Sequence, residues 1–81
     1  MRKGSMVRFE IAAGRQTGRI VEIVKPGALP DRKALREENY AMCSGGLGTI
    51  RRRVMSFVVV VEQRYGRRPI AYWPKKVEAL E

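Results

Sequence analysis

Apolar and polar residues alternate near the start of the chain. Val7, Phe9 and Ile11 are separated by charged residues, and this period of two predicts a β-strand over residues 6–11 with one buried face. The stretch that follows contains a glycine and few apolar residues, which predicts a turn over residues 12–17. The chain therefore opens as the first arm of a hairpin.

Three further strands are predicted from β-favouring residues, over residues 18–25, 54–62 and 69–73. The segment Phe57–Val61 is apolar at every position, so both faces of its strand should be covered. Such a strand is central in a barrel or sandwich, or lies at a contact between subunits. A short last strand is predicted over residues 78–81.

The pattern changes between the second and third predicted strands. Asp31 is a suitable N-cap for a short helix, and residues 43–48 are rich in glycine. Those glycines lack the Lys-Ser/Thr ending of a phosphate loop. We therefore predict a long, partly helical insertion over about residues 26–50, inside a single domain that spans residues 1–81.

Two stretches resemble the small barrels of the KOW and Tudor type. Gly4–Phe9, with Gly14 and Gly18–Val21, is similar to their opening hairpin, and Tyr72–Glu81 is similar to their close. The resemblance implies a mostly β fold, an SH3-like five-stranded small barrel with an insertion between strands 2 and 3. It also implies a turn of 3₁₀-helix over residues 75–77.

The layout is also similar, more weakly, to the type II dihydrofolate reductase barrel, which works as a tetramer. That family has a Val-Gln-Ile-Tyr-Pro stretch lining its pore, and Pro74 aligns the stretch with Ile70–Trp73. Ala71 stands where the glutamine would be. We therefore do not expect reductase activity.

The charge is strongly unbalanced. The 81 residues include 17 Lys and Arg against 8 Asp and Glu, a net charge of +9, and most of the surplus lies between residues 49 and 77. Arginine keeps its charge at physiological pH and presents a planar fork that matches phosphate. A polyanion, DNA or RNA, is therefore the expected partner.

Arginines should gather at two ends of one hairpin. A turn at Tyr65 and Gly66 would place three arginines at its tip, and a triplet precedes the strand at the other end. Exposed aromatic rings nearby would stack on bases. The predicted nucleic-acid contacts are Arg51, Arg52, Arg53, Arg64, Arg67, Arg68, Lys75, Lys76, Tyr65 and Trp73.

An alternative function is a protein-interaction adaptor or a homo-oligomer. In that case the Phe57–Val61 strand or the insertion forms the contact, and the charges serve solubility. The sequence does not decide between the two functions.

The chain has few residues suited to catalysis or metal binding. The chain has no histidine and one cysteine, Cys43, so the usual general base, nucleophile pairs and zinc-ligand sets are missing. We expect no enzyme activity, no cofactor and no metal, and an inert thiol. A lone cysteine suits the reducing cytoplasm, and no apolar run is long enough to span a membrane.

Overall fold

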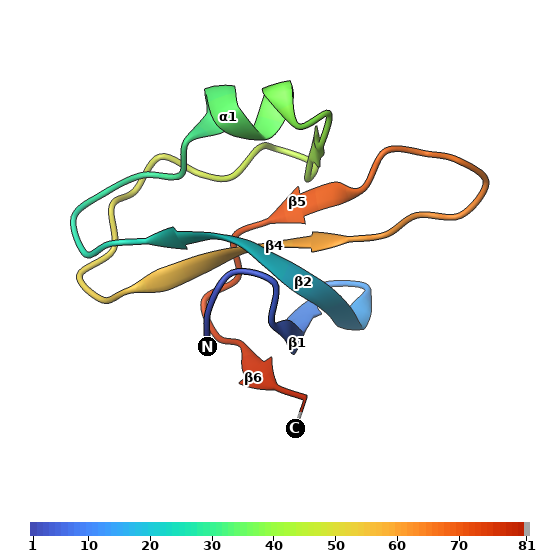
Figure 1. Ribbon diagram of the computed structural model, residues 1–81. Coiled ribbons are helices and arrows are strands. Elements are labelled where there is room, and N and C mark those ends of the chain that lie inside the picture. Colours follow the sequence, from blue (N-terminus) through green and yellow to red (C-terminus); the bar gives the residue numbers. More distant parts are fainter. Residues whose placement is uncertain (81) are drawn as a thin grey trace.

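The computed structural model describes residues 1–80, which form one mixed sheet with a short helix packed on one side of it (Figure 1). The strand order is β3-β5-β4-β2-β1-β6. The elements are β1 (Met6–Ile11), β2 (Gly14–Val24), α1 (Arg32–Glu37), β3 (Ala41–Met42), β4 (Ser56–Val61), β5 (Ile70–Tyr72) and β6 (Glu78–Ala79).

The opening hairpin is tighter than the sequence predicted. β1 has the predicted bounds, but β2 begins at Gly14, so the expected turn over residues 12–17 is wrong. Ile11 pairs directly with Gly14, which leaves a two-residue turn. Gly14 has φ +121°, a backbone conformation that residues with a Cβ rarely adopt, and it closes the turn.

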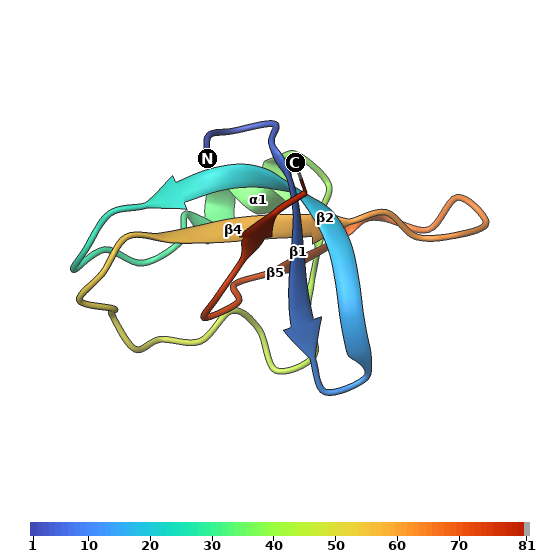
Figure 2. The ribbon, with the colours of Figure 1, turned by 90° about the horizontal axis from the view of Figure 1, so that it is seen from below.

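Strand β2 is long enough to pair with two neighbouring strands. Its first half pairs with β1 and its second half with β4, and the register shifts between Ile20 and Glu22. This bulge lets β2 bend, and Figure 2 shows β1 crossing β4 steeply as a result. The bend wraps the sheet around its own core.

Strand β4 is central, as the sequence predicted. It pairs with β2 along one edge and with β5 along the other. Val58 and Val60 belong to one apolar cluster, and Phe57 and Val59 belong to a second cluster on the opposite face. Burial on both faces is why this strand has no polar position between Phe57 and Val60.

The sequence predicted a partly helical insertion over residues 26–50, but this segment takes part in the core and the sheet. Helix α1 starts after Asp31, whose Oδ1 accepts a hydrogen bond from the Ala34 backbone N–H at 3.1 Å. Leu35 of the helix and Leu47 of the following loop are buried against β4 and β5. The same segment also supplies β3, which pairs in parallel with β5.

The sheet has six strands and is not closed, whereas the sequence predicted a five-stranded barrel. Strands β3 and β6 are its two edges, and each has only two residues. No 3₁₀ turn forms over residues 75–77, and Glu81 of the predicted last strand lies outside the described residues. Within residues 1–80, no helix is long and apolar enough to cross a membrane.

Gly18 of β2 packs directly against β4, and this contact gives a test of the fold. A Cβ at Gly18 would lie 2.5 Å from the Val60 carbonyl oxygen and 2.6 Å from Val59 Cγ1. We predict that Gly18→Ala lowers the free energy of unfolding by about 3 kcal/mol, because the paired backbones must separate.

Gly45→Ala is the control for Gly18→Ala in urea unfolding. Gly45 has open space around it, and its φ of +82° alone should cost about 1 kcal/mol. Equal losses for the two variants would contradict the close approach of β2 and β4.

Candidate functional site

Arg52 joins the segment before β4 to the segment after β5. Its Nη1 donates to the Pro74 carbonyl oxygen and its Nη2 to the Trp73 carbonyl oxygen, both at 2.7 Å. Its Cζ lies 3.8 Å from the centre of the Trp73 ring, close enough for a cation–π interaction. Burial lowers the pKa of Arg52 from its ordinary value. These contacts give Arg52 a structural role that its place in a triplet did not reveal.

Trp73 lies in the core and is 7% exposed. Its Nε1 donates to Ser56 Oγ at 2.8 Å, so the buried indole N–H and the buried hydroxyl each have a hydrogen-bond partner. With its ring covered in this way, Trp73 cannot stack on a base in this conformation. Of the ten predicted contact residues, we therefore treat Trp73 and Arg52 as structural.

The contacts of Arg52 bring two basic segments together. Arg51 and Arg53 flank it on one segment, and Lys75 and Lys76 follow Pro74 on the other; these four side chains are exposed. We call them the Arg52 cluster. Arg51 also donates from Nη1 to the Gly27 carbonyl oxygen at 2.9 Å, which links the segment before β4 to the turn after β2.

A second basic group lies on the loop between β4 and β5. Arg64, Arg67 and Arg68 are exposed, and Tyr65 is 94% exposed. We call the three arginines the loop cluster. The loop, drawn in orange, projects beyond the body of the protein in both views (Figures 1 and 2). It leaves β4 at the end opposite to the Arg52 cluster, as the sequence predicted.

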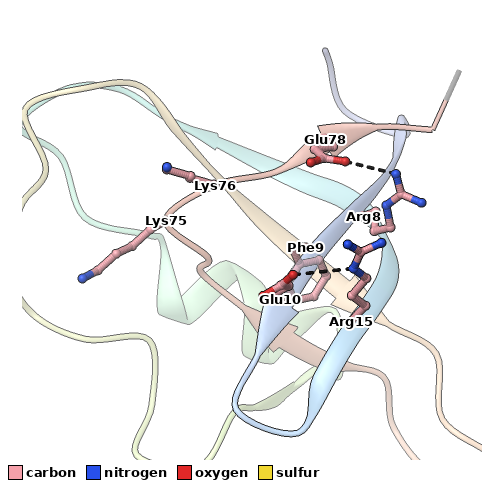
Figure 3. Close-up of a pocket in the computed structure, with 7 residues that line it drawn as sticks. All are labelled: Arg8, Phe9, Glu10, Arg15, Lys75, Lys76 and Glu78. Carbon is pink, nitrogen blue, oxygen red and sulfur yellow. Dashed lines mark hydrogen bonds and ion pairs between the residues drawn. The ribbon is translucent and has the colours of Figure 1, made fainter.

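A hollow of about 530 Å³ lies between the opening hairpin and the segment before β6 (Figure 3). Phe9, Glu10, Glu78 and the cations Arg8, Arg15, Lys75 and Lys76 line it. Arg8 contacts Glu78 at 3.1 Å and Arg15 contacts Glu10 at 3.5 Å, across exposed ion pairs. Lys75 and Lys76 point away from both pairs (Figure 3).

Sequence reasoning missed Arg8 and Arg15 as lining residues. Cross-strand pairing of Glu10 with Arg15 is visible only once the two-residue turn is known. That turn carries Ala12-Ala13, and lacks the Asn-Gly or Asp-Gly pair that predicts a tight hairpin.

Few arginines have a carboxylate partner. Three of the twelve lie within 4.0 Å of one among residues 1–80: Arg8, Arg15 and Arg19, the last with Glu62 at 3.6 Å. Exposed pairs of this kind contribute little to stability. Neither the Arg52 cluster nor the loop cluster has an acidic partner within that distance in the described part of the chain.

Other reactive groups are few. Cys43 donates from Sγ to the Gly46 carbonyl oxygen at 2.8 Å, and burial raises the pKa of its thiol, so little thiolate forms at neutral pH. Burial also raises the pKa of Glu22, which accepts the Asp31 N–H. No group of three His, Cys, Asp or Glu side chains within the described residues could hold a metal ion.

Comparisons of the chain with protein families, with curated proteins and with solved structures find no match. Function must therefore be inferred from the fold and the side chains themselves.

The contrasting roles of two neighbouring arginines are testable. Arg52→Ala should lower the free energy of unfolding by about 2 kcal/mol, because it removes two charged hydrogen bonds and the cation–π contact. Arg53→Ala, which removes the same charge from an exposed side chain, should stay within about 0.5 kcal/mol of the wild type. If thermal unfolding shows similar losses of stability for the two variants, Arg52 does not hold the segment before β4 against the segment after β5.

Proposed function

We propose that this protein is a non-catalytic module that binds DNA or RNA through exposed basic side chains. The contacts would come from the Arg52 cluster at one end of β4 and from the loop cluster with Tyr65 at the other. The observation that carries the proposal is the lack of carboxylate partners around these seven cations in the described part of the chain.

Unpaired cations make this proposal physically reasonable. A phosphate backbone carries regularly spaced negative charge, and neutralising it releases condensed counterions into solution. This gain in binding free energy needs no base-specific contact. Two separate basic groups can therefore act together along one strand or groove. The 36 Å long axis of the protein is the longest span available to such a backbone.

We also propose that the fold is an SH3-like small barrel of the KOW or Tudor type. The order β5-β4-β2-β1-β6 supports this, because successive strands are neighbours and the last strand returns to the first. Residues 26–50 would then be an elaboration between the second and third barrel strands. A single cysteine, which cannot form an intrachain disulfide, favours the reducing cytoplasm.

Nucleic-acid binding can be tested by fluorescence anisotropy at two salt concentrations. We predict salt-sensitive binding that Lys75→Ala/Lys76→Ala weakens by about tenfold, with the slope of log K against log salt reduced by about two. The same weakening should be seen with unrelated sequences, since phosphate contacts carry no base information.

Lys33→Ala/Arg36→Ala is the matched control, because it also removes two exposed cations. These lie on α1, on the other side of the sheet from the segment before β6 (Figure 1). Equal weakening by both double variants would mean that net charge alone matters. Absence of binding at low salt would remove the proposal.

A second candidate function is association with a protein, including another copy of this chain. The observation that favours it is a set of exposed apolar side chains before β4: Ile50 is 82%, Val54 66% and Met55 55% exposed. The Phe57–Val61 strand is an unsuitable contact, because its edges already pair with β2 and β5.

Light scattering over a range of concentrations separates the two candidates. The second candidate predicts a dimer, or a complex with a partner, that Ile50→Glu dissociates. A wild type that stays monomeric at high concentration would exclude self-association through this segment.

A further inference from the structure

Tyr65 occupies an unusual backbone position. Tyr65 has φ +60° and Gly66 has φ +70°, and the Arg67 N–H donates to the Arg64 carbonyl oxygen at 3.4 Å. Positive φ at both central residues is what a type I′ turn requires, and asparagine, aspartate or glycine is favoured at the first central position of such a turn. A tyrosine there carries a steric cost that an asparagine would avoid.

Nothing in the fold compensates for this cost. The Tyr65 side chain is 94% exposed and belongs to neither apolar cluster, so its ring does not stabilise the folded chain by burial. Strained backbone positions that packing does not explain are found preferentially at binding and catalytic sites. The ring is also the most exposed of the large apolar side chains described.

The surroundings of the ring suit a nucleotide. Tyr65 lies on the rim of a hollow of about 390 Å³, which is within the range of small-molecule sites. Gln16 and Gln63 also line the hollow, and amide groups can both donate to and accept from base edges. Arg64 and Arg67 flank the turn and line the same hollow together with Glu62, so two positive charges and one negative charge lie beside the ring.

We infer that the β4–β5 loop is a site for an unpaired base, which stacks on the Tyr65 ring while the loop cluster holds the flanking phosphates. This inference rests on the proposed nucleic-acid binding and narrows it to single-stranded DNA or RNA. Inside a duplex both faces of each base are covered by neighbouring bases, so an exposed ring has a partner only where a base is unpaired.

The site is tested with three fluorescent probes of one length: a single strand, the same strand with abasic sites in place of its bases, and a duplex. The wild type should bind the normal single strand about tenfold more tightly than the abasic strand, since stacking is worth that much per base. The duplex, whose bases are paired, should gain nothing from the Tyr65 ring, and the salt slope for the two single strands should be the same.

Tyr65→Asn separates a binding role from a structural one. Asparagine suits the type I′ turn, so this variant should melt a few degrees higher than the wild type while losing the preference for the normal strand over the abasic one. Tyr65→Phe keeps the ring and the strain, and should bind within about twofold of the wild type.

The outcomes distinguish this inference from the proposal on which it rests. If no probe binds at low salt, nucleic-acid binding itself is wrong. If the abasic strand binds as tightly as the normal strand and Tyr65→Asn changes only the melting temperature, the module still binds phosphate backbones but the base site is wrong. Loss of binding to all three probes in Tyr65→Asn would also overturn the base site.

Discussion

The structure depends on the burial of β4, in which residues 56–60 are buried and Val61 is half-buried. Its side chains fill two apolar clusters, one on each face of the sheet, and both of its edges are paired. No charged side chain can be accommodated on such a strand, so the cations of this part of the chain lie before it and after it. The separation of the two basic groups is thus a direct consequence of how the core is built.

Arginine has at least three roles within this short chain. Arg8, Arg15 and Arg19 form exposed pairs with carboxylates, and Arg52 is held by two carbonyl oxygens and an indole ring. The exposed members of the Arg52 and loop clusters have no carboxylate partner among the described residues. Exposed positive charge without a carboxylate partner is what a polyanion would recognise.

The sequence predicted the elements that depend on local pattern. Alternation around Val7 and Phe9 gave the bounds of β1, the continuous apolar run gave a central β4, and Asp31 correctly marked the start of α1. Other features depend on contacts between distant segments and could not be predicted in this way. Strand β3 has two residues and exists because the Ala41 N–H and the Cys43 N–H reach the Pro69 and Ala71 carbonyl oxygens of the chain around β5.

The residues predicted to contact nucleic acid also depend on contacts between distant segments. Alternation along β5 placed Ala71 and Trp73 on one side, but burial of the indole depends on Leu35 and Leu47 in the same cluster and on Arg52 over the ring. The role of Arg52 likewise depends on Trp73 and Pro74, which are more than twenty residues away. By contrast, exposure at Tyr65 follows from its place in a turn, which the sequence does reveal.

The most direct test of the central claim is a titration of the ¹⁵N-labelled protein with an oligonucleotide, followed by NMR. Nucleic-acid binding through the two ends of β4 predicts that amide signals shift around Arg53, around Lys75 and Lys76, and along the loop from Arg64 to Arg68, while those of α1 stay in place. Shifts confined to α1, or no shifts at low salt, would contradict it.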